Sequence, residues 1–163
     1  MTKGTDARKN FQELPVRTPE DVPEGYPLAW LAERYDLHGE KLSNNALPEG
    51  FDEKDAERGT ADDAVARLAL GEAIRRSVTG FHGNRIHEAL LLGATWHEVA
   101  GALGIGTDQA REVLRSHADR QYRVRMELAA EGSSLGLSEE EHAVALALTA
   151  LGDDEPYRGG FRG

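Results

Sequence analysis

The strongest constraint on how this chain folds lies near its centre, where two helical patterns follow each other across a glycine. Thr95 and Glu98 have the spacing of a capping box, in which each side chain forms a hydrogen bond with the backbone N–H of the other residue. Gly104 stands where a helix commonly ends in a left-handed backbone conformation. Ala100 is small enough to let a second helix cross closely. The sequence therefore predicts a helix over about 95–103 that ends at Gly104.

A second helix is expected to follow directly. Thr107 is of a residue type that caps helix starts, and Ile105 is placed to fill the corner between the two helices. No glycine or proline interrupts the chain from Thr107 until Gly132, so this helix is expected over about 107–118 and can extend to about Glu131. The apolar positions that give the two helices their buried sides are Val99, Leu103, Ala110, Val113 and Leu114.

This spacing resembles the helix-turn-helix motif, in which two helices cross steeply through a tight turn. The resemblance covers residues 95–115, and also the preceding helix if that helix is counted as the first of a tri-helical domain. The segment from Gly93 to Gly104 is also similar to the helix-turn-helix of sigma-factor region 4 and of small actinobacterial regulators. The resemblance implies a sequence-specific transcriptional regulator whose partner is double-stranded DNA.

The resemblance also implies that the second helix enters the major groove with its exposed face toward the bases. Arg111 and Arg115 are the expected contacts to guanine edges or phosphates, because a guanidinium binds both through paired hydrogen bonds. Asp108 and Glu112 depart from a basic face: a carboxylate can accept from cytosine or orient an arginine, but phosphate repels it. The DNA-binding residues predicted in this way are Thr95, Thr107, Asp108, Arg111, Glu112, Arg115, Arg120 and Arg123.

The distribution of charge bears on this prediction. The formal net charge of −10 disfavours nucleic acid as a partner, because Lys and Arg are needed to neutralise phosphate. However, residues 1–80 and 131–163 each carry a net charge of −5, whereas residues 81–130 are neutral. Between residues 111 and 125, five arginines accompany two carboxylates, which gives a local charge of +3. We interpret this stretch either as a phosphate-binding face or as a solvated helix face with internal ion pairs.

We expect an all-α fold, with a small helical domain built on the tri-helical unit. Residues 1–59 are acidic and proline-rich, and are expected to form a flexible N-terminal arm with one short helix at Pro27–Tyr35. Residues 60–131 are expected to form the helix-turn-helix domain, and 132–151 to hold a C-terminal helix. Residues 152–163 are expected to be a disordered tail, either simply solvated or, through its arginine–glycine sequence, loosely RNA-binding.

Three further helices are expected from the periodicity of the apolar residues, at about 61–79, 84–92 and 138–151. The first follows the capping residue Thr60, and the last opens with a capping box of Ser138 and Glu141. The last helix is expected to pack on the core or on a second copy of the chain, as a homodimer through 118–151. The residues expected on the buried side of the first are Ala61, Val65, Leu68, Ala69, Ala73 and Ile74.

Composition excludes several classes of protein. The chain has no Cys, which removes disulfides, thiolate nucleophiles and cysteine-bound metals. No apolar run approaches the roughly 20 residues that cross a bilayer, and the start lacks a signal peptide, so a cytoplasmic protein without a membrane partner is expected. The central histidines do not match a zinc-binding spacing, and no catalytic motif is present. We therefore expect no cofactor, no metal site, no catalytic residues and no enzymatic activity.

Two functions from different classes remain. The first is the sequence-specific DNA-binding regulator. The second is an acidic protein-interaction module, in which the same helical unit docks on the transcription machinery or on another DNA-binding protein. Asp108 and Glu112 favour the second function, whereas Arg111, Arg115 and the spacing of the motif favour the first.

Overall fold

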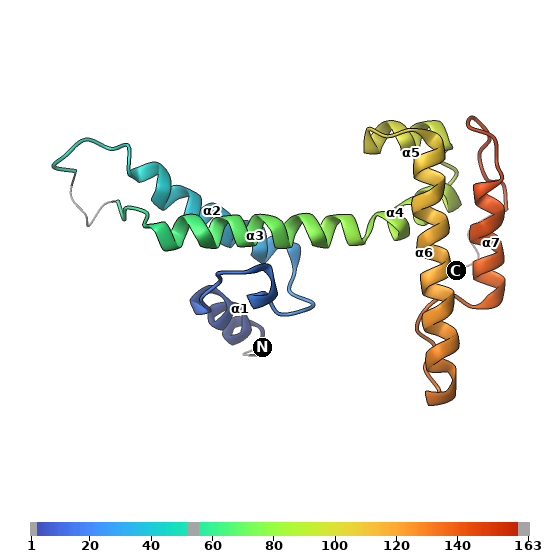
Figure 1. Ribbon diagram of the computed structural model, residues 1–163, viewed down its shortest axis with the longest axis horizontal. Helices are drawn as coiled ribbons and strands as arrows, with labels where there is room; N and C mark the ends of the chain where they lie inside the picture. The colour runs from blue at the N-terminus through green and yellow to red at the C-terminus, as the bar shows by residue number, and fades with distance from the viewer. Residues whose placement is uncertain (1–2, 52–55, 160–163) are drawn as a thin grey trace. The chain divides into compact units, whose positions relative to one another are not determined.

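The computed structural model describes residues 3–51 and 56–159, and within these ranges all regular structure is helical (Figure 1). The α-helices are α1 (Lys3–Glu13), α2 (Leu28–Asn44), α3 (Ala61–Gly80), α4 (His82–Leu91), α5 (Trp96–Leu103), α6 (Thr107–Leu128) and α7 (Glu139–Thr149), with 3-10 helices η1 (Pro19–Asp21) and η2 (Ala129–Glu131). The predicted all-α class is confirmed. Among the described helices, none is both long enough and apolar enough to cross a membrane. The chain divides into two compact units, Met1–Thr79 and Gly80–Gly163.

The first unit folds around a core of its own, contrary to the prediction of a flexible arm with one short helix at Pro27–Tyr35. Phe11 stacks on Tyr26 with 4.3 Å between the ring centroids. The prolines delimit the helices instead of preventing them, since Pro19 opens η1 and Pro27 is the N-cap of α2. The buried residues of this core are Phe11, Val16, Leu31, Ala69 and Leu70.

The boundary between the units lies after Thr79, not at residue 60 as predicted. The bounds predicted for α3 agree with the structure to within one residue, but α3 contributes Ala69 and Leu70 to the core of the first unit. Its buried face also differs from the prediction, because Leu68 is 77% exposed while Ala66 is buried. Apolar residues lie on several faces of α3, so their periodicity does not identify the packed face.

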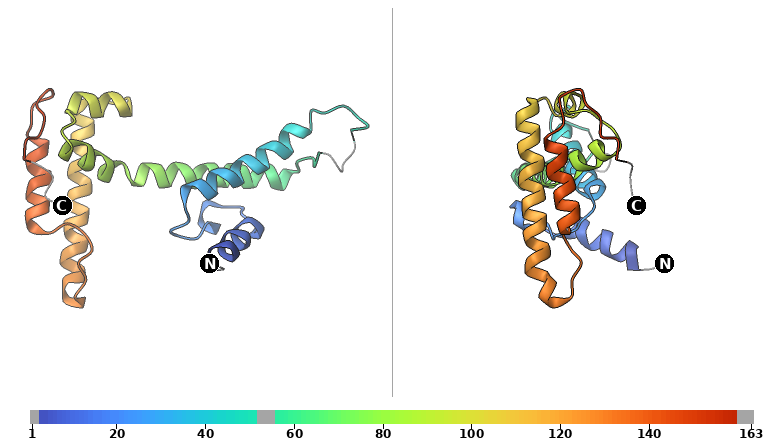
Figure 2. Two further views of the ribbon diagram at one scale, coloured as in Figure 1. Left: turned by 180° about the vertical axis from the view of Figure 1, so that it is seen from behind. Right: turned by 90° about the vertical axis from the view of Figure 1, so that its right-hand side faces the viewer.

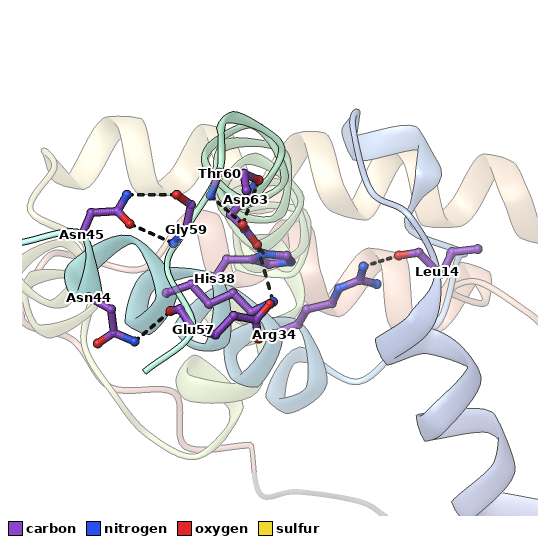
Figure 3. Close-up of polar contacts among 10 residues, drawn as sticks. Leu14, Arg34, His38, Asn44, Asn45, Glu57, Gly59, Thr60 and Asp63 are labelled. Atoms are coloured by element: carbon purple, nitrogen blue, oxygen red, sulfur yellow. Dashed lines mark hydrogen bonds and ion pairs between the residues drawn. The ribbon is translucent and has the colours of Figure 1, made fainter. Parts of the chain in front are cut away.

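A buried cation, Arg34, joins the end of α1 to α2. Its guanidinium donates hydrogen bonds to the backbone carbonyl oxygens of Phe11 and Leu14, where α1 ends. Figure 3 shows the contact with Leu14. The same group lies over the Phe11 ring, 5.2 Å from the ring centroid. The last carbonyls of a helix have no partner within the helix and carry partial negative charge. Arg34 therefore satisfies groups that would otherwise be unpaired in the interior of the first unit.

Replacing Arg34 by leucine is expected to lower the free energy of unfolding of the first unit by about 2–4 kcal/mol, because buried carbonyl oxygens lose their donor. Arg34→Lys should recover only part of this loss, since an ammonium lacks the fork that reaches both carbonyls. Urea unfolding followed by circular dichroism measures both changes. Arg8→Leu is the control: it removes an exposed ion pair with Glu33, worth at most about 1 kcal/mol. Equal effects at Arg34 and Arg8 would contradict this account.

A polar cluster holds the start of α3 against α2 (Figure 3). The Asp63 carboxylate accepts a hydrogen bond from the Thr60 backbone N–H at 2.8 Å, and His38 Nδ1 lies 2.8 Å from Asp63 Oδ1. These contacts, the Thr60 N–H first among them, lower the pKa of Asp63 to about 2. The Asn45 amide exchanges hydrogen bonds with the backbone of Gly59. The predicted capping role of Thr60 is confirmed, since its hydroxyl accepts from the Asp63 N–H at 3.4 Å.

The second unit packs α4, α5 and α7 against the long helix α6. In the ribbon, α7 lies alongside α6, and the view from behind shows the same pairing (Figures 1 and 2). The predicted helices at 84–92, 95–103 and 138–151 agree with α4, α5 and α7 to within two residues, and α6 continues to Leu128. The buried core comprises Ile86, Leu90, Trp96, Val99, Ala100, Ala110, Leu114 and Leu148.

One prediction for the region after α6 needs correction, and another is borne out. Residues 152–159 are mostly exposed but do not form a free tail, because Tyr157 contacts the core of the second unit and the Gly152 carbonyl accepts from the Glu155 N–H at 3.1 Å. The predicted disorder therefore does not hold for these residues, while the last part of the arginine–glycine sequence, 160–163, lies outside the described residues. Of the two placements predicted for the last helix, packing on the core of the same chain is present: Tyr122 of α6 stacks on His142 of α7 with centroids 4.6 Å apart.

Candidate nucleic-acid interface

The start of α5 is fixed by the predicted capping box. The Thr95 hydroxyl accepts a hydrogen bond from the Glu98 N–H at 3.2 Å, and the Glu98 carboxylate accepts from the Thr95 N–H at 2.8 Å. The Thr95 N–H and hydroxyl lower the pKa of Glu98. Directly after the cap, Trp96 is fully buried and its indole N–H donates to the Leu148 carbonyl at 2.9 Å. The first turn of α5 is thereby tied to α7.

The turn between α5 and α6 has the expected left-handed glycine. Gly104 has φ 65° and ψ 32°, a conformation that costs glycine little because it has no Cβ. The Ile105 N–H then donates to the Ala100 carbonyl at 3.1 Å, which closes the end of α5. Gly106 is the N-cap of α6 and offers no side chain. Thr107 is therefore the first helical residue and not the cap, which corrects the role predicted for it.

Arg111 is turned inward, whereas the prediction has it on the exposed face. Its side chain is 15% exposed. One terminal nitrogen donates to the Asp153 carboxylate at 2.6 Å and to the Leu151 carbonyl at 2.9 Å. The guanidinium also lies 5.2 Å from the centroid of a Trp96 ring, a favourable arrangement for a cation and an aromatic face. Arg111 therefore positions α6 against α5 and the segment after α7.

Asp153 is the residue of this site that sequence patterns do not reveal. Besides the ion pair with Arg111, its carboxylate accepts from the Thr107 hydroxyl at 3.2 Å, and its backbone carbonyl accepts from the His97 N–H at 2.9 Å. These contacts, the Arg111 hydrogen bond first, lower the pKa of Asp153. Segment 151–157 therefore lies across the first turns of both α5 and α6. No local motif signals a contact between residues 42 positions apart.

The outward face of α6 carries charges of both signs. Steps of three and four residues bring Asp108, Glu112, Arg115, Asp119 and Arg123 onto one face of the helix. Asp108 is fully exposed. Arg115 donates to Glu112 at 2.7 Å, so an internal ion pair of the kind considered from sequence is present. None of the ion pairs among the described residues involves Arg123. This face thus presents Arg115 and Arg123 beside Asp108 and Glu112, while the Asp119 carboxylate lies 2.7 Å from His142 Nε2 of α7.

Arg120 lies away from that face. It borders a pocket with His117 and Gln121, which follow the side of α6 turned toward α4 and the loop before α7. Thr95 is likewise separate, since its hydroxyl is occupied by the capping box of α5. The structure therefore brings together only part of the predicted DNA-binding set.

An apolar groove of about 250 Å³ opens between α4 and α5. Its floor is formed by Ile86, Val99 and Leu103, with Arg85 and Glu98 among the charged groups that line it. A groove with such a lining can receive an apolar side chain of another molecule. It lies on different residues from the outward face of α6.

Two histidines lie in the packing between α4 and α6. His117 is 8% exposed, and burial, followed by the charges of Arg120 and His87, lowers its pKa. Burial also lowers the pKa of His87, against the opposing charge of Glu141. The Nε2 atom of His87 is buried without a hydrogen-bond partner among the described residues. Among the residues that the structure describes, no group of three or more His, Asp or Glu side chains is arranged to hold a metal ion.

Acidification from pH 7.5 to 5.5 is expected to destabilise the second unit through His87 and His117. Because their pKa values are lowered in the folded state, the unfolded chain binds protons more readily, and stability present above about pH 6.5 is lost as the pH falls through the lowered values. Urea unfolding at several pH values tests this. A His87→Gln/His117→Gln variant should show a flatter pH dependence over this range. The same slope in the variant and the wild type would contradict the assignment.

No protein-family model matches the chain, and no curated protein or solved structure matches it. Its function must therefore be inferred from its own residues and their geometry.

Proposed function

We propose that the protein is a sequence-specific DNA-binding transcriptional regulator that presents α6 to the major groove as the second helix of a helix-turn-helix. The observation that supports this most is the junction of α5 and α6. A capped helix of eight residues ends at a left-handed Gly104, and α6 begins at Thr107 after a turn of three residues. With α4 packed on both, three helices share one core, the arrangement that helix-turn-helix proteins use to hold a helix against DNA.

The cations available for DNA on this proposal are Arg115 and Arg123. Both are exposed on the outward face of α6, where a guanidinium can bind a guanine edge or a phosphate. Arg115 donates to Glu112 at 2.7 Å and would exchange this ion pair for a base or phosphate on binding. Arg111 instead acts as a positioning residue, because Asp153 and Trp96 occupy it. With a net charge of −10, weak non-specific binding is expected, so that specific contacts supply most of the affinity.

The proposal is tested by fluorescence anisotropy with pooled genomic duplexes at two salt concentrations, followed by the fragment that binds best. Arg115→Gln/Arg123→Gln should weaken binding to that fragment by about tenfold or more and reduce the salt slope by about 2. The matched control is Arg75→Gln/Arg85→Gln, which changes the net charge equally and removes exposed pairs with Glu72 and Glu88. No retained fragment at low salt, or equal weakening by both variants, would refute the proposal.

The second candidate is an acidic protein-interaction module, and the charges on α6 favour it. Asp108 and Glu112 lie on the face that would contact DNA. Asp154 and Glu155, the two residues that follow Asp153, are also exposed. An Asp108→Asn/Glu112→Gln variant separates the two functions. For a DNA-binding protein it should raise DNA affinity, because two charges that repel phosphate are removed. For a module that binds a basic protein surface it should weaken capture of that protein and leave DNA binding absent.

A further inference from the structure

A second cavity of the Gly80–Gly163 unit, about 380 Å³ in volume, lies beside the first turn of α4. It is bounded by α4, α6 and the loop that precedes α7. In contrast to the apolar groove, its lining is rich in polar groups. The side chains that line it are Phe81, Asn84, His117, Arg120, Gln121 and Leu137.

Two glycines fix the walls of this cavity. A Cβ on Gly83 would overlap the Cβ of His117, so α4 and α6 are in direct contact there and the imidazole has no room to shift toward α4. Gly136 has φ 86°, and a Cβ there would overlap the Gln121 carbonyl oxygen. The Leu137 N–H donates to that same carbonyl at 3.2 Å. The positions of the polar groups are therefore set by backbone packing.

Several polar groups at this cavity have no partner among the described residues. His117 is 8% exposed and lines the cavity, and none of the side-chain hydrogen bonds between described residues involves its ring. Arg120 is exposed at the cavity and takes part in none of the ion pairs of the described chain. Phe81, the N-cap of α4, provides no side-chain acceptor for the first turn of that ten-residue helix, whose free N–H groups favour an anion.

We propose that this cavity binds a small organic carboxylate, whose carboxyl group contacts Arg120 and His117 and whose apolar part packs on Phe81 and Leu137. The guanidinium supplies two parallel donors that match a carboxylate. The amides of Asn84 and Gln121 add neutral donors. One arginine is the only cation among these lining groups, so it balances one negative charge, whereas a phosphate would bring up to two. The proposal does not depend on DNA binding, since none of these side chains belongs to the outward face of α6.

The ligand is sought by isothermal titration of the full chain with acetate, butyrate, benzoate and phenylacetate, and with inorganic phosphate and benzamide as comparisons. At least one carboxylate should bind at one saturable site. If benzoate binds, benzamide, its neutral counterpart, should bind at least about tenfold more weakly. Arg120→Gln should lower the affinity for the carboxylate that binds by about tenfold or more. Arg123→Gln is the matched control, because it removes an equal charge three residues along α6 but outside the cavity, and should leave the affinity unchanged.

A second measurement reports on His117 directly. Because burial and the charge of Arg120 lower the pKa of His117, a carboxylate bound beside it should raise that pKa, which NMR titration of the ring detects. Asn84→Leu, at an exposed position of the cavity, provides a second variant that should weaken binding. The proposal is overturned if no carboxylate binds saturably, if phosphate binds best, if both arginine variants weaken binding equally, or if the His117 resonance does not respond to the bound ligand.

Discussion

Replacement of Trp96 by alanine is expected to lower the free energy of unfolding of the second unit by about 3–5 kcal/mol. The indole is fully buried, among the largest such side chains of the described chain. It touches three elements at once: it belongs to α5, donates a hydrogen bond to Leu148 of α7 at 2.9 Å, and lies against the guanidinium of Arg111 on α6. Alanine would leave a cavity, an unpaired carbonyl and an arginine without its aromatic partner.

Trp96→Phe separates these contributions. It keeps an aromatic ring but loses the indole N–H, so a smaller loss of about 1–2 kcal/mol is expected. Urea unfolding followed by far-ultraviolet circular dichroism measures both variants. Trp30→Phe, a substitution of the same type in the core of the first unit, serves as the control because Trp30 forms no hydrogen bond to a described residue through its indole. If Trp96→Ala and Trp96→Phe cost the same, packing of the ring does not contribute as inferred.

A substitution at Gly83, where α4 and α6 touch, is also expected to destabilise the second unit. Gly83→Ala should destabilise the second unit by about 1–3 kcal/mol, since the added methyl group overlaps the Cβ of His117 and overpacking forces the helices apart. Gly101→Ala is the control. Gly101 lies inside α5, and a Cβ there meets nothing within 4 Å. That substitution should stabilise the protein by about 0.5–1 kcal/mol, because alanine favours a helix more than glycine does.

Thermal and urea unfolding should therefore show a loss of stability for Gly83→Ala and a gain for Gly101→Ala. Two destabilising substitutions would show that glycine at Gly101 has a role beyond flexibility. Two stabilising substitutions would show that α4 and α6 do not approach as closely at Gly83 as the structure has them. The difference between the variants is informative because both make the same chemical change inside a helix.

Features that depend on a few neighbouring residues are those that the sequence predicts well. The capping boxes at Thr95 and Ser138 and the left-handed Gly104 each require three or four residues of context, and all three occur in the structure. The bounds of α3, α5 and α7 follow from the same local rules. The helix boundaries predicted from these signals therefore agree with the observed ones to within two residues.

Features that depend on distant residues are not predicted. Arg111 has the spacing of an exposed residue, yet its partner Asp153 lies 42 positions away in what resembles a polar tail. The N-terminal segment is a second example. Its prolines suggest disorder, but in the structure Phe11 and Leu31 belong to one buried core with Leu70 of α3. In both cases burial is decided by which elements meet, a property that periodicity within one element does not contain.

The hydrogen bonds of Asp153 have a consequence for how this protein can be divided. They close the first turns of α5 and α6 from a position beyond the last helix. A fragment limited to α4–α6, or one that stops after α7, would remove the hydrogen bond of Arg111 to Asp153 and the contact of Tyr157 with the core. A fragment that keeps the native contacts of α6 therefore has to extend to at least Tyr157.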